Sequence, residues 1–131
     1  MNVLTHKPKT ILVVDDDPVI REMMVDILDL EGYPVDVARN GREALNRIQS
    51  LQRAGCDCGY LIFLDLIMPI MDGQSFYREL MEYPELRAQQ IVVIMSALDH
   101  LAQGWMPDVN VVIHKPFSVE DILGVIQQYI G

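Results

Sequence analysis

Three short runs of apolar residues, at positions 11–14, 60–64 and 91–95, constrain the fold of this chain more than any other feature of its sequence. Continuous apolar runs of this length are typical of parallel strands that are buried on both faces of a sheet. Helical patterns separate the runs, and short connections with right-handed crossovers favour a doubly wound arrangement of such elements. The sequence therefore predicts an α/β fold with helices on both faces of a parallel sheet.

Two further strands and five helices complete the predicted fold. Residues 34–38 alternate apolar and polar side chains, as in a half-exposed edge strand, and residues 111–113 form another short apolar run. Helix start signals occur at four places, namely Asp17 before Pro18, Asn40 before Gly41, Asp72 before Gly73, and a pattern resembling a capping box at Ser118 and Asp121. Pro84 is expected to end the third helix. The fourth helix, around residues 99–104, is expected to be short or distorted.

The length and charge of the chain limit its class. A chain of 131 residues suits one domain, and 50% apolar residues are enough for a full-sized core without disulfides or metals. The net charge of -9 argues against direct binding to nucleic acid or to an anionic membrane surface. No apolar run reaches the ~18 residues of a membrane span, and the first residues lack a secretory signal. We therefore expect a cytoplasmic protein without membrane insertion.

Polar side chains follow four of the five predicted strands at the point where each strand ends. They are Asp15, Asp16 and Asp17 after the first strand, Asp65 after the third, Ser96 after the fourth and Lys115 after the fifth. Ligands of open α/β sheets bind outside the carboxyl ends of the strands, so these side chains are expected to meet at one edge. Each has an ordinary explanation by itself, as a helix cap, a turn or a solvated strand end. Their joint position favours a site.

The residue types at this edge suit phosphoryl transfer. Asp15, Asp16 and Asp65 would repel one another unless a cation lay among them, and hard oxygen ligands of this kind suit Mg²⁺. A hydroxyl group and a lysine beside Mg²⁺ can neutralise charge on a transferring phosphoryl group. A carboxylate can itself be the nucleophile and form an aspartyl-phosphate.

Four motifs resemble the receiver domain of bacterial two-component response regulators. They read ILVVDDDP, LIFLDLIMPIMDG, VVIMSA and VIHKPF, in the order and with the spacing of that family. The resemblance covers about residues 10–130 and implies a receiver domain at 10–131 after a short tail at 1–9. It also implies a flavodoxin-like fold similar to that of the chemotaxis response regulator, with five parallel strands in the order 2-1-3-4-5.

The resemblance further implies a phosphoacceptor and its metal site. Asp65 would accept a phosphoryl group from the phosphohistidine of a sensor histidine kinase or of a histidine phosphotransfer protein. Asp16 would bind Mg²⁺ directly and Asp15 would assist. Asp65 and the backbone carbonyl of Ile67 would complete the protein ligands. Such a chain is a signalling phosphoacceptor rather than an enzyme.

The remaining motif positions would stabilise the phosphoryl group and switch the conformation. Ser96 would hydrogen-bond one phosphoryl oxygen, and Lys115 would pair with another, or with Asp65 before phosphorylation. The bond before Pro116 would be cis, and Ala97 would belong to the switch region. The switch position three residues before the lysine is usually aromatic in this family, but here it is Val112. A rotating aromatic side chain therefore cannot report phosphorylation in this chain.

The switch would control a downstream protein or effector domain, and phosphorylation-dependent dimerisation is a further expectation. Two alternatives stay open. The first is a pseudo-receiver, an interaction module that takes no phosphoryl group, because the stretch between Ser96 and Lys115 is shorter than usual and contains Trp105. The second is a phosphatase like the haloacid dehalogenases, which needs an acid two residues after its nucleophile, where this chain has Ile67.

Overall fold

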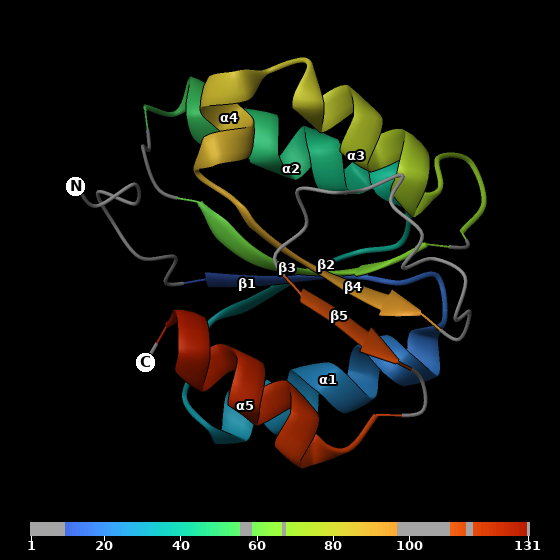
Figure 1. Ribbon diagram of the computed structural model, residues 1–131, viewed down its shortest axis with the longest axis vertical. Coiled ribbons are helices and arrows are strands. Elements are labelled where there is room, and N and C mark those ends of the chain that lie inside the picture. The colour runs from blue at the N-terminus through green and yellow to red at the C-terminus, as the bar shows by residue number, and fades with distance from the viewer. Residues whose placement is uncertain (1–9, 56–58, 67, 97–110, 115–116, 131) are drawn as a thin grey trace.

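The computed structural model describes residues 10–55, 59–66, 68–96, 111–114 and 117–130, and its centre is a sheet of five parallel strands (Figure 1). The strands are β1 (Thr10–Val14), β2 (Val35–Ala38), β3 (Tyr60–Asp65), β4 (Ile91–Ser96) and β5 (Val111–His114). Their order across the sheet is β2-β1-β3-β4-β5, which confirms the predicted topology.

The strand register aligns the carboxyl ends of the strands. Val14, the last residue of β1, pairs with Ala38, the last residue of β2, and with Leu64 near the end of β3. Asp65 in turn pairs with Met95, one residue before the end of β4. The carboxyl ends of β1, β3, β4 and β5 therefore lie at the same edge of the sheet, where the arrowheads of β4 and β5 point in Figure 1.

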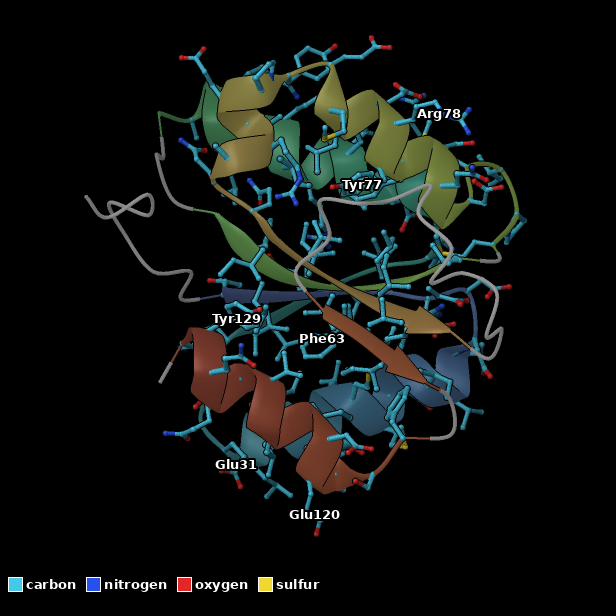
Figure 2. All side chains as sticks on the ribbon, in the orientation of Figure 1. Glu31, Phe63, Tyr77, Arg78, Glu120 and Tyr129 are labelled. Atoms are coloured by element: carbon cyan, nitrogen blue, oxygen red, sulfur yellow. The ribbon has the colours of Figure 1, made fainter. Side chains whose placement is uncertain are left out.

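Helices cover both faces of the sheet, as predicted (Figure 1). The helices are α1 (Pro18–Leu30) and α5 (Val119–Tyr129) on one face, and α2 (Gly41–Arg53), α3 (Gly73–Met81) and α4 (Pro84–Ala88) on the other. The alternation of side chains along β3 divides the core: Leu61 and Phe63 pack toward α1 and α5, whereas Leu64 packs toward α2 and α3. Figure 2 shows Phe63 directed toward the side of the sheet that α1 and α5 cover, and Tyr77 of α3 directed toward the sheet.

The helix start signals of the sequence form the expected caps. The side chains of Asp17, Asn40 and Asp72 each accept a hydrogen bond from a backbone amide in the first turn of α1, α2 and α3. Ser118 and Asp121 form the complete capping box of α5. The longest helices among the described residues are α1 and α2, each with 13 residues. In the described part of the chain, no helix has the length and apolar character needed to cross a membrane.

The structure adds one helix that the sequence did not predict. Pro84 follows the end of α3, as expected, but it also begins α4, a helix of five residues with proline at its first position. Leu86 buries the inner side of α4 against the core. A segment this short carries too little periodicity to be recognised as a helix from its sequence. The weak helix predicted at 99–104 is a different segment and lies outside the described residues.

At the amino end of β3, opposite the predicted site, the side chains of Gln90 and Tyr60 form hydrogen bonds that hold the strand. The buried amide oxygen of Gln90, which follows α4, accepts a hydrogen bond from the Tyr60 backbone N–H at 2.8 Å. The Tyr60 hydroxyl donates to the Asp36 carboxylate at 2.7 Å. Burial and this hydrogen bond raise the pKa of the Tyr60 phenol, so it stays protonated and anchors β3 to β2.

Candidate functional site

Three carboxylates meet at the carboxyl edge of the sheet. Asp15, Asp16 and Asp65 each offer an oxygen atom, and these atoms all lie within 4.8 Å of one another. Asp15 is fully buried and Asp65 is 8% exposed, whereas Asp16 is open to solvent. The cluster follows from the register, because Val14 pairs with Leu64 and the next residue of each strand is an aspartate. The predicted convergence of β1 and β3 carboxylates therefore has a simple structural origin.

The donor set of this cluster fits a small divalent cation. Three carboxylates at such separations repel one another when ionised, and a bound cation removes that repulsion. All the side-chain donors are hard oxygens, which Mg²⁺ prefers. Asp16 gives the site a solvent-exposed side, so an ion with part of its water shell can reach the buried Asp15 and Asp65.

Asp15, in the turn from β1 to α1, forms hydrogen bonds through three of its atoms. Its backbone amide donates to the Ala38 carbonyl at 3.1 Å. Its side-chain Oδ1 accepts a hydrogen bond from the Asp17 amide at 3.0 Å, and its carbonyl oxygen accepts one from Arg21 Nη1 at 2.8 Å. The sequence reading missed Arg21. The only local signal is a cationic side chain one turn into the helix that follows the acidic triplet.

The loop from β3 to α3 is fixed at both ends. The Gly73 amide donates to the Leu66 carbonyl at 3.0 Å, and the Met71 carbonyl accepts from the Gly41 amide at 2.7 Å. Gly73 lies so close to the strand that a Cβ atom there would be 2.5 Å from the carbonyl oxygen of Asp65. The predicted start of α3 at Gly73 therefore also fixes the backbone of the candidate acceptor.

Ile70, in the same loop, has a strained backbone. Its φ angle is 68°, and it is the one non-glycine residue with positive φ in the described ranges. The Met71 amide donates to the Pro69 carbonyl at 2.7 Å, so Ile70 is the central residue of a three-residue γ-turn. A γ-turn with positive φ is rare and strained, above all for a β-branched residue. The Ile70 side chain is 85% exposed, so its own burial does not offset the strain.

Replacing Ile70 with glycine is expected to stabilise the domain by about 1 kcal/mol. Strain at such a position costs about 1–3 kcal/mol, and the greater freedom of unfolded glycine offsets up to about 1 kcal/mol of the gain. Urea unfolding of both proteins measures the difference. Ile70→Val keeps the β-branch and should leave stability nearly unchanged. A stability loss in Ile70→Gly would show that the turn is not strained in solution.

Ser96 and Val112 are the remaining predicted site residues that the structure describes. Ser96 is the last residue of β4 and pairs with His114, the last residue of β5. The two strands therefore end at the same edge of the sheet. Val112 of β5 is partly buried and packs against the core on the α2 and α3 side. The predicted site residues that lie outside the described ranges are Ile67, Ala97, Lys115 and Pro116.

Comparison with known proteins identifies the family of this chain. The model of the response regulator receiver domain matches residues 11–127. The chain belongs to this family. A curated relative, the response regulator MprA of Mycolicibacterium vanbaalenii, is 32% identical to the receiver domain over 116 residues. The match covers 88% of this chain and 48% of that protein, so the chain spans about half the length of the curated relatives that it matches.

Solved structures of other receivers confirm the fold of this receiver domain. The response regulator TrrA of Thermotoga maritima, solved in complex with Mg²⁺ and BeF, is 29% identical with a TM-score of 0.76, covering 92% of this chain and 97% of that one. The receiver domain of a sensor histidine kinase from Pseudomonas aeruginosa is 26% identical with a TM-score of 0.71, covering 95% and 98%. That structure has a magnesium ion coordinated in its active site cleft.

Proposed function

We propose that this receiver domain accepts a phosphoryl group on Asp65 in the presence of Mg²⁺. The observation that carries the proposal is the convergence of three carboxylates within 4.8 Å at the carboxyl edge of a receiver fold. Asp15, Asp16 and Asp65 would hold the ion together with the backbone carbonyl of Ile67. The Mg²⁺-containing sites of related receivers support the same ion here. The proposed domain boundaries are 10–131, with residues 1–9 as a tail.

The transfer step uses the Asp65 carboxylate as nucleophile. One carboxylate oxygen attacks the phosphorus atom of a phosphohistidine, and the bond between phosphorus and the imidazole nitrogen breaks. The electron pair of that bond stays on the nitrogen, and the product is an aspartyl-phosphate. Bound Mg²⁺ would supply charge neutralisation for the transferring group. The hydrogen bonds of Asp15 in the β1–α1 turn and of Gly73 at the end of the β3–α3 loop support a preorganised acceptor edge.

Ser96 and Lys115 complete the proposed site. A hydroxyl at Ser96 would donate to one phosphoryl oxygen, and the ammonium group of Lys115 would pair with another. The end of β4 at Ser96 and of β5 at His114 supports this assignment, because both strands end at the acidic edge. Switching would involve Ala97, Val112 and the peptide bond before Pro116, without the rotating aromatic residue of other receivers.

The proposed partners follow from the family. The phosphoryl donor would be a sensor histidine kinase or a histidine phosphotransfer protein, and the phosphorylated receiver would control a downstream protein or effector domain in the cytoplasm. A phosphorylation-dependent dimer is part of the same proposal. The net charge of -9 supports protein partners rather than nucleic acid at this domain. Apart from phosphoryl uptake and loss, we propose no catalytic activity.

Incubation with acetyl phosphate tests the proposal without a known kinase. Intact-mass spectrometry should detect one added phosphoryl group when Mg²⁺ is present and none when the ion is removed with EDTA. Beryllofluoride, which forms a stable analogue of the acyl phosphate, should bind under the same conditions and controls for rapid hydrolysis. If neither the adduct nor beryllofluoride binding occurs, the chain is a pseudo-receiver, and the proposal is wrong.

A further inference from the structure

Arg21 holds the carbonyl group of Asp15 at the end of β1. The pairing of β1 with β2 ends at Val14 and Ala38, and Asp15 follows this last pair. Asp15 is fully buried, and buried carbonyl groups are hydrogen-bonded in nearly all native structures. The guanidinium of Arg21 reaches back from the first turns of α1 and donates to this oxygen at 2.8 Å. A hydrogen bond from a charged donor is stronger than one between neutral groups.

This bond acts on the acidic cluster through the backbone. Among the described residues, Arg21 forms no ion pair with Asp15, Asp16 or Asp65, so its charge does not neutralise a carboxylate directly. It holds instead the peptide group that joins Asp15 to Asp16. The Asp17 amide, one residue further, donates to Asp15 Oδ1 at 3.0 Å and orients that carboxylate. A shift of the Asp15 carbonyl would therefore move two members of the cluster together.

We propose that Arg21 is a positioning residue for the acidic cluster, which it aligns for cation binding by holding the Asp15 carbonyl. The bond joins helix α1 to the end of β1, so it defines the turn on which Asp15 and Asp16 lie. The identity of the cation as Mg²⁺ rests on the proposed function. The alignment of the turn by Arg21 does not.

Arg47 provides a matched control for this role. It lies on α2 and donates from Nε to the carbonyl of Val37 on β2, also at 2.8 Å. Both arginines thus reach from a helix to a strand carbonyl with equal donor–acceptor distances. β2 is an edge strand, and Val37 lies outside the acidic cluster. Arg47→Met removes a contact of the same kind, at a more exposed position, together with the 3.9 Å ion pair of Arg47 with Asp36, and it leaves the Asp15 turn untouched.

The experiment compares Arg21→Met, Arg21→Lys and Arg47→Met in the whole chain. Methionine keeps much of the apolar stem and removes the donors, whereas lysine keeps the charge and offers a different donor geometry. Isothermal calorimetry measures the Kd for Mg²⁺. Removing a residue that positions a metal ligand commonly weakens metal binding by about tenfold or more. We expect such a rise in Kd for Arg21→Met, a smaller rise for Arg21→Lys, and no change for Arg47→Met.

Amide hydrogen exchange in metal-free protein gives a second readout that does not depend on Mg²⁺ binding. The Asp17 amide should exchange faster in Arg21→Met than in wild type, because its acceptor on Asp15 is no longer held, and it should be unchanged in Arg47→Met. Equal effects of the two methionine variants on both readouts would overturn the proposal, as would tighter Mg²⁺ binding by Arg21→Met. If the wild type binds no Mg²⁺, the proposed function is wrong. The exchange rate of the Asp17 amide in Arg21→Met and Arg47→Met then tests the role of Arg21 by itself.

Discussion

Asp65→Asn is expected to lower phosphoryl uptake from acetyl phosphate by at least about 10³-fold, into the background, while the fold is retained. The amide has nearly the shape of the carboxylate but is a poor nucleophile, so the acyl phosphate cannot form. The variant also removes one of three carboxylates whose oxygens lie within 4.8 Å of one another. It should therefore bind Mg²⁺ more weakly. Intact-mass spectrometry measures the labelling, and circular dichroism checks the fold.

Asp17→Asn is the matched control for this prediction. Asp17 belongs to the same acidic triplet, but its side chain caps α1 by accepting a hydrogen bond from the Val19 amide at 2.9 Å. Asparagine caps helices about as well as aspartate, so this variant should fold and accept the phosphoryl group normally. Labelling of Asp65→Asn at the wild-type rate would place the acceptor elsewhere. Loss of labelling in Asp17→Asn alone would also contradict the assignment.

Gly73→Ala is expected to destabilise the domain by about 1–3 kcal/mol and to impair phosphoryl uptake. The new Cβ atom would be 2.5 Å from the Asp65 carbonyl oxygen and 2.9 Å from the Leu66 Cα atom. Both obstacles are backbone atoms, so no side-chain rotation can relieve the clash. The required shift falls on the end of β3 and on the bond from the Gly73 amide to Leu66. Because Asp65 is the candidate acceptor, stability and labelling should fall together.

Gly124→Ala separates this steric effect from the general effect of replacing a glycine. Gly124 lies inside α5, and a Cβ atom there would meet no atom within 4 Å. Alanine is favoured over glycine in a helix interior, so this variant should be more stable by up to about 1 kcal/mol and should label normally. Urea unfolding gives both free energies. A Gly73→Ala protein as stable as wild type would show that the loop after β3 yields easily in solution.

Much of the site could be predicted from the sequence because strand ends are local signals. The apolar runs that end before Asp15 and Asp65 locate both residues at the ends of strands. Parallel strands align their carboxyl ends, so the topology alone brings those two side chains to one edge. The caps at Asp17, Asn40 and Asp72 could also be predicted from the sequence, because a cap involves only the capping residue and the first turn that follows it.

Other features depend on which distant atoms the folded chain brings together. Helix α4 has five residues and gains its stability from burying Leu86, so it has no pattern of its own. The hydrogen bond from Arg21 to Asp15 depends on the angle at which α1 leaves the sheet. The strained φ of Ile70 contradicts local preference and persists because neighbouring contacts hold the loop, including that of Gly41 with Met71.

The sequence by itself therefore determined the succession of strands and helices along the chain, the starts of four helices and the edge at which the acidic residues meet, whereas the order of the strands across the sheet was expected only from the family resemblance. The properties that the sequence determined follow from the periodicity of apolar residues and from helix caps, because both involve only residues that are close together in the sequence. The tertiary structure alone decided the close approach of Gly73 to the Asp65 backbone, the γ-turn at Ile70 and the contact of Arg21 with Asp15. Each of these features depends on how backbone and side-chain atoms pack against one another. That packing exists only once the sheet and both helical layers have come together.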